Sequence, residues 1–132
     1  MIAGDAIARA CGDVPGLLRA ALVLLPEAFF LAGHGEARAS DYEPLVRAAA
    51  RCLTPRATPR GDVAPAPFVE YVLVLAHGVI VIEASRQSSR LALVLECDHS
   101  ANLTLIQLSC RAALAALEAT LGRELETWGM AS

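Results

Sequence analysis

The sequence predicts a single domain of the α+β class, in which helices cover both faces of an antiparallel sheet. At 132 residues the chain is long enough to bury one core. Its strand-like runs, among them YVLVLA, GVIVI and LALVL, are apolar at successive positions. A strand of this kind has both of its faces covered. Three further segments have helical spacing, which provides the outer layers of a three-layer α/β/α arrangement.

The composition excludes several classes of protein. Apolar residues make up 55% of the chain, charged residues 19%, and the net charge is −3, which is not the composition of a disordered segment. There is no lysine and the arginines are scattered, so binding to nucleic acid phosphates is not indicated. No apolar run reaches the roughly 20 residues of a membrane span, and no secretory signal is visible. We therefore expect a cytoplasmic protein.

The first half of the chain predicts a helix, a hairpin and a second helix. Apolar residues recur at helical spacing over residues 2–11, and Gly12 ends that helix. Two apolar runs, 17–25 and 28–32, are joined at Pro26-Glu27 and predict a hairpin, followed by a loop over 33–36. The second helix covers about 42–53, with Asp41 as its N-cap.

The second half predicts a three-stranded meander and a long helix. Four prolines place residues 54–67 in an extended loop. Strands are expected over 68–76, 79–84 and 91–97, with His77-Gly78 as a tight turn between the first two. A helix is expected from Ser100, its N-cap, to about residue 126. The domain thus covers residues 1–126, and 127–132 form a tail. The last helix carries two apolar stripes, so we expect it to be mostly buried.

The size of the second helix predicts self-association. Its twelve residues extend about 18 Å and are about 10 Å wide, whereas a five-stranded sheet is roughly 24 Å across. Apolar sheet surface is therefore left exposed in a monomer, and exposed apolar patches commonly form two-fold interfaces. We expect a homodimer.

The order of these elements, together with the stretch LALVLECDHSANLTLIQLSCRAALAALEA, resembles the roadblock/LC7 family of dynein light chains and bacterial MglB-like proteins. Ser100-Ala101-Asn102-Leu103 matches the start of the family's last helix, whereas Pro26-Glu27 replaces the usual Asp-Gly turn. The resemblance implies a profilin-like fold with strand order 2-1-5-4-3. The second helix would lie on one face, and the first and last helices on the other.

The resemblance also implies that the third strands and the second helices of two chains pair. The expected dimer interface is Tyr42, Leu45, Val46, Ala49, Leu53, Phe68, Val69, Tyr71 and Leu73. It further implies a scaffold or regulator of a Ras-like small GTPase, docked on the paired second helices at Glu43, Arg47 and Arg51. A structural subunit of a larger complex, without sensitivity to nucleotide state, is the alternative. A small-ligand sensor is the third reading.

Motifs for catalysis and for cofactors are lacking. A P-loop requires lysine, and neither G-x-S-x-G nor H-E-x-x-H occurs. Asp98-His99 beside Cys97 is the one acid–imidazole–thiol group, but neighbours on a strand point to opposite faces. We expect no enzyme, no metal and no cofactor. The glutamates Glu70, Glu83 and Glu96 are expected to mark strand ends or an edge.

The four cysteines have no metal-like spacing and are expected to be buried thiols. They are Cys11, Cys52, Cys97 and Cys110.

Overall fold

The structure, a computed structural model, describes residues 2–25, 27–35, 39–53, 70–84 and 91–127, and only the backbone of residues 2, 39, 40 and 122–127. Its elements in chain order are α1 (Ile2–Cys11), β1 (Leu17–Leu24), β2 (Phe29–His34), the 3₁₀ turn η1 (Ala39–Tyr42), α2 (Glu43–Leu53), β3 (Glu70–Val74), β4 (Val79–Ala84), β5 (Leu91–Cys97) and α3 (Leu103–Thr127). The expected loop over 54–67 lies outside the described residues.

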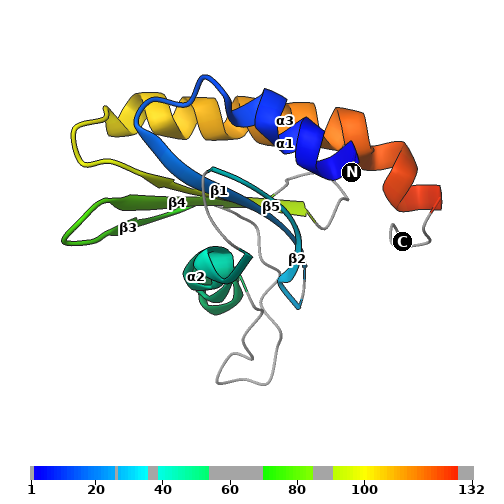
Figure 1. The fold of residues 1–132 in the computed structure, drawn as a ribbon, viewed down its shortest axis with the longest axis horizontal. Helices are drawn as coiled ribbons and strands as arrows, with labels where there is room; N and C mark the ends of the chain where they lie inside the picture. The colour runs from blue at the N-terminus through cyan, green and yellow to red at the C-terminus, as the bar shows by residue number, and fades with distance from the viewer. Residues whose placement is uncertain (1, 26, 36–38, 54–69, 85–90, 128–132) are drawn as a thin grey trace, which may run out of the picture.

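The five strands form one sheet in the order β2-β1-β5-β4-β3, and the neighbouring strands are antiparallel. Helices α1 and α3 cover one face and α2 covers the other, so the domain has three layers (Figure 1). The three layers expected from the sequence and the strand order implied by the resemblance are confirmed. None of the described helices has the length and hydropathy of a membrane span.

Each face of the sheet has its own core, because successive residues of a strand point to opposite faces. On β1, Leu22 packs under α1 and α3, whereas Ala21 and Val23 pack against α2. All seven residues of β5 are buried. This two-sided burial explains why the strands lack apolar–polar alternation.

Several boundaries differ from the sequence prediction. Gly33 and His34, expected in a loop, extend β2, because both pair with β1. Helix α2 begins at Glu43 after the turn η1, so Asp41 lies inside that turn. The cap of α3 is Asn102, whose Oδ1 accepts the Leu105 N–H at 3.1 Å. The expected N-cap, Ser100, instead donates its N–H to Asp98 Oδ1 at 2.8 Å.

The prediction that α3 is mostly buried is wrong for the described side chains. One stripe faces the sheet and is buried, with Ile106, Cys110 and Leu117 at its centre. On the opposite side, Leu105 is 50% exposed and Leu108 is 55% exposed. A second apolar stripe on a helix therefore indicates burial only if a further layer covers it, and no described element of this chain does so.

Candidate functional site

Helix α2 presents the expected charged face to solvent. Glu43, Arg47 and Arg51 are exposed, and Arg47 Nη2 lies 2.6 Å from Glu43 Oε1 in an i,i+4 ion pair. The apolar side of the helix packs on the sheet, and its heptad-like spacing puts the charged residues opposite to it. Exposed pairs of this kind add little stability, which leaves these side chains available to a partner.

Four of the expected interface residues are instead part of the chain's own core. Tyr42, Leu45, Ala49 and Leu53 are all buried against the sheet. A side chain that is already buried has almost no surface to give to a second chain. Val46 is half-buried on the flank of α2. The interface proposed below therefore includes Val46 and leaves out the four core residues.

Tyr42 joins the start of α2 to strand β2. Its hydroxyl donates to the Gly35 carbonyl at 3.1 Å, and its ring lies 5.4 Å from that of Phe30. Burial raises the pKa of the Tyr42 phenol. At Gly33 a Cβ atom would come within 2.5 Å of the Tyr42 ring, so this strand position requires glycine for close packing. The tyrosine thus fixes the place of α2 over the sheet.

Strand β3 forms one edge of the sheet and carries exposed apolar side chains. Tyr71 is 41% exposed and Val74 is 71% exposed, whereas Leu73 is half-buried. The expected interface residues Phe68 and Val69 lie outside the described residues. Within the described part of the chain, β3 pairs with β4 alone. An open apolar edge of this kind is a template for pairing with another chain.

Polar contacts hold this edge strand to α3. Gln107 Nε2 donates to Glu70 Oε1 at 2.8 Å, and Arg111 Nε donates to Glu70 Oε2 at 3.2 Å. Arg111 Nε also lies 3.5 Å from Glu83 Oε1 on β4. Arg111 therefore neutralises carboxylates on two neighbouring strands and fixes β3 against the helix layer.

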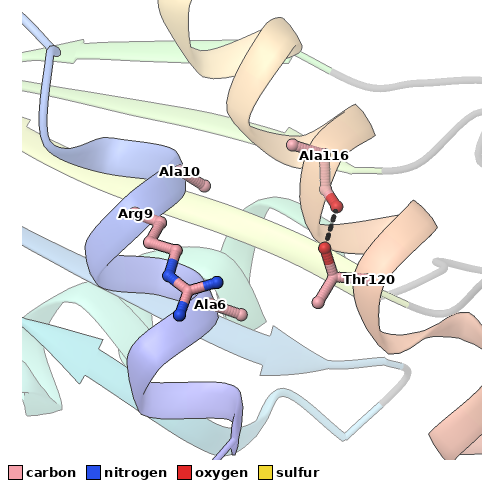
Figure 2. Close-up of a pocket in the computed structure, with 5 residues that line it drawn as sticks. All are labelled: Ala6, Arg9, Ala10, Ala116 and Thr120. Atoms are coloured by element: carbon pink, nitrogen blue, oxygen red, sulfur yellow. Dashed lines mark hydrogen bonds between the residues drawn. The ribbon is translucent and has the colours of Figure 1, made fainter.

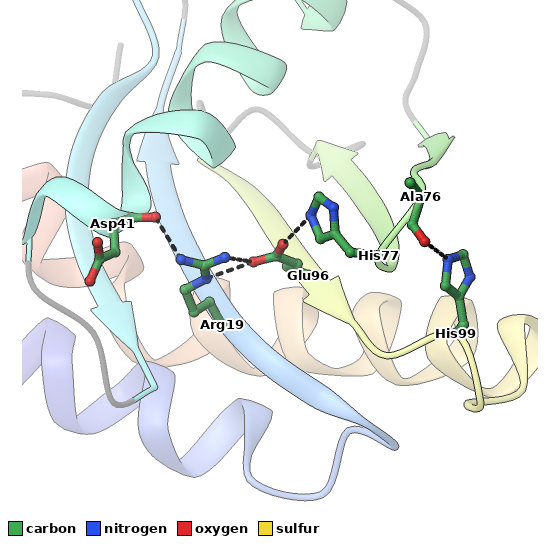
Figure 3. Close-up of polar contacts among 6 residues, drawn as sticks. All are labelled: Arg19, Asp41, Ala76, His77, Glu96 and His99. Carbon is green, nitrogen blue, oxygen red and sulfur yellow. Dashed lines mark hydrogen bonds and ion pairs between the residues drawn. The ribbon is translucent and has the colours of Figure 1, made fainter.

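A second polar cluster lies at the other side of the sheet (Figure 3). Arg19 Nε donates to Glu96 Oε1 at 2.6 Å, and His77 Nε2 lies 3.4 Å from Glu96 Oε2. Arg19 also donates to the Asp41 carbonyl at 3.3 Å. One buried carboxylate thus connects β1, β5, the β3–β4 turn and the start of α2.

These clusters add detail to the expectation that the glutamates mark strand ends or an edge. All three lie within one residue of a strand end, as expected, but Glu83 and Glu96 are buried and lie on inner strands. Only Glu70 is on an edge strand. The apolar pattern gave no sign of their arginine partners, because Arg19 and Glu96 are 77 residues apart.

The candidate residues for catalysis do not converge. The Cys97 side chain is buried, and burial raises the pKa of its thiol to about 11. Asp98 accepts the Ser100 N–H, while the His99 ring lies 3.0 Å from the Ala76 carbonyl oxygen (Figure 3). Within the described ranges, no group of three or more His, Cys, Asp and Glu side chains could hold a metal ion.

The cysteines are free thiols, and three of the four are buried. The prediction is wrong for Cys52, which is half-buried on α2. Burial raises the pKa of Cys11 to about 12 and that of Cys110 well above its ordinary value.

A shallow hollow lies between α1 and α3 (Figure 2). It has a volume of about 170 Å³ and is lined by Ala6, Arg9, Ala10, Ala116 and Thr120. The Thr120 hydroxyl donates to the Ala116 carbonyl of its own helix at 2.9 Å. The lining is mainly methyl groups, which suits an apolar side chain better than a polar substrate. Sequence reasoning missed this hollow, because it depends on how the two helices cross.

No protein-family profile and no curated protein matches the sequence. Solved structures do match by shape. A roadblock/LC7 domain from Streptomyces avermitilis superposes with a TM-score of 0.68 at 15% identity, covering 89% of this chain and 96% of that one. Myxococcus xanthus MglB gives 0.66 at 18%, covering 92% and 95%. The gliding protein MglB from Thermus thermophilus gives 0.59 at 19%, covering 92% and 89%. The chain therefore has the roadblock/LC7 fold.

Proposed function

We propose that this protein is a non-enzymatic, homodimeric scaffold or regulator that acts in the cytoplasm and binds a Ras-like small GTPase. The observation that carries the proposal is the open edge strand β3, whose apolar side chains are exposed. Tyr71 and Val74 are exposed on that edge. The choice of a GTPase as the partner comes from the resemblance to MglB-like proteins, and the fold shared with MglB structures supports it.

The proposed dimer joins the two β3 strands into one continuous sheet and brings the α2 helices side by side. Tyr71, Leu73, Val74 and Val46 contribute from the described residues, and Phe68 and Val69 remain predictions. Pairing would satisfy the outer backbone groups of β3, which the described strands leave open. The paired α2 helices would then present Glu43, Arg47 and Arg51 of both chains on one surface.

The dimer is tested on the mass of the protein in solution. We expect twice the 13.9 kDa of one chain by light scattering. Tyr71→Arg should shift the mass to that of the monomer, because it puts a charge from each chain into the apolar contact between the edges. Phe29→Arg is the matched control, since Phe29 is 62% exposed on the opposite edge strand β2. A wild-type monomer at every concentration would refute the dimer.

The GTPase is tested by capture from the native lysate. Affinity-tagged protein is incubated with GDP or with a non-hydrolysable GTP analogue, and the bound proteins are identified by mass spectrometry. We expect a Ras-like GTPase to be enriched in one nucleotide state. Arg47→Glu with Arg51→Glu should abolish its capture and leave the dimer intact, whereas Arg9→Glu, an exposed arginine on α1, should not. If the same partners are captured with GDP and with the GTP analogue, the result favours a structural subunit without sensitivity to nucleotide state.

A further inference from the structure

The outward side of α3 carries an apolar stripe that the fold leaves uncovered. Five exposed positions lie on it at alternating spacings of three and four residues, namely Leu105, Leu108, Ala112, Ala115 and Ala119. At 1.5 Å per residue the stripe is about 21 Å long. It contains no charged side chain, and it faces away from the sheet, since α3 forms the outer layer beside α1 (Figure 1). We call these five residues the outer seam.

The spacing of the outer seam is that of a coiled coil. Alternation of three and four residues gives the a and d positions of a heptad repeat, which pack against a second helix. The buried stripe of the same helix, at Ile106, Cys110, Leu117 and Leu121, already packs on the sheet. Helix α3 therefore carries two apolar sides, of which the described part of the chain covers one.

The sizes of the side chains indicate what covers the outer seam. Its first two positions are leucines, and its last three are alanines. In an antiparallel pair of helices an a position meets a d position of the partner. Leu105 of one copy then lies against Ala115 of the other, and Leu108 lies against Ala112. Each large side chain meets a small one, and the two-fold axis repeats both contacts.

The hollow between α1 and α3 lies beside this seam. Ala116 lines the hollow together with Ala6 and Ala10 (Figure 2), and it directly follows Ala115 of the seam, although no seam residue itself lines the hollow. A volume of about 170 Å³ suits a leucine side chain, since a cavity of about 150 Å³ holds a benzene molecule. The hollow is thus a neighbour of the alanine end of the seam, and the fit of the seam itself rests on the pairing of leucines with alanines.

We propose that the outer seam binds the outer seam of a second copy of this chain, with the two α3 helices antiparallel. The surface lies on the opposite face of the sheet from α2, so it is separate from the proposed β3 dimer and does not depend on it. A strip about 21 Å by 10 Å covers roughly 200 Å² per copy, against about 800 Å² per partner in a stable interface. The contact is therefore weak and reversible.

The test is sedimentation velocity over a wide range of protein concentration. The wild type should show a concentration-dependent association step. Leu105→Glu should raise the Kd of this step by about tenfold or more, because each contact then buries a carboxylate. Leu18→Glu is the matched control, since Leu18 on β1 is 45% exposed and lies off the seam.

Two further variants test the register and the fit. Leu105→Glu combined with Ala115→Arg should restore association, because the antiparallel register places each glutamate on a partner's arginine. Ala115→Trp should weaken association by occupying the place of the partner's Leu105, whereas nonspecific hydrophobic sticking would become stronger. Circular dichroism checks that each variant is folded.

The proposal is overturned if wild type and Leu105→Glu associate alike, if the double variant is not restored, or if Ala115→Trp strengthens association. Tyr71→Arg separates the two surfaces. It should remove the β3 dimer and leave the α3 step in place, so failure of one proposal is distinguishable from failure of the other.

Discussion

Removing Arg19 is expected to leave the Glu96 carboxylate buried without its cation. Glu96 is 2% exposed, and Arg19 contacts its Oε1 through both Nε and Nη2. Breaking a fully buried ion pair costs about 3–5 kcal/mol. The Arg19 side chain is 30% exposed, so solvent screens part of the interaction, and His77 remains near Oε2. For Arg19→Met we therefore expect a loss of about 2–3 kcal/mol in the free energy of unfolding.

The assay is urea unfolding followed by circular dichroism, at one fixed protein concentration because self-association changes the apparent stability. With a slope of about 1–3 kcal/mol per molar urea, the midpoint should fall by about 0.7–3 M. The double variant Arg19→Met with Glu96→Leu should recover to within about 1 kcal/mol of wild type, since no unpaired charge is left. A single variant that loses less than about 0.5 kcal/mol, or a double variant no more stable than the single, would falsify this account of the cluster.

Three other outcomes follow from the same structure. In the folded protein at pH 8, Cys52 should react with a thiol reagent first, because burial raises the pKa of the remaining thiols; these are Cys11, Cys97 and Cys110. The reaction rates of the four cysteines are monitored by mass spectrometry, and equal rates would contradict this prediction. Gly33→Ala should lower the thermal midpoint by several degrees, because its Cβ meets the Tyr42 ring; Gly4→Ala, with open space around it, is the control. The hydrogen bonds from Ser100 lower the pKa of Asp98, so its stabilisation is present above about pH 4 and is lost as the pH falls through the lowered pKa. The free energy of unfolding of Asp98→Asn should therefore lie below that of wild type at pH 7, and the two values should converge in acid.

Much of the fold was predictable because it depends on local signals. Helical spacing, apolar strand runs and turn residues such as His77-Gly78 gave the element order, and the Leu75 N–H to Gly78 carbonyl bond of 2.8 Å confirms that turn. The strand order rested on the resemblance alone. The pairing of β1 with β5 joins residues between 67 and 80 positions apart, and no local signal encodes it.

The functional surfaces were harder to predict, because they depend on which side of an element is covered. The apolar stripe of α2 was found correctly, but Leu45 and Ala49 face the chain's own sheet. The second stripe of α3 was taken as buried, whereas its Leu108 is exposed. Periodicity identifies the apolar side of a helix, but it does not show which element packs against that side. The exposed side chains of β3 follow from its edge position, which is a property of the whole sheet.

The placing of the first and last strands at the centre of the sheet has a consequence during synthesis. Strand β1 pairs with β5 along its whole length, yet β5 leaves the ribosome about 70 residues later. Until β5 is made, the apolar β1–β2 hairpin lacks the strand that pairs with β1. The N-terminal half of the chain therefore cannot form a stable domain by itself. Contacts this distant in sequence slow the search for the native state. The nascent chain should therefore fold late and in one step, and it is the partly made chain that needs protection from aggregation.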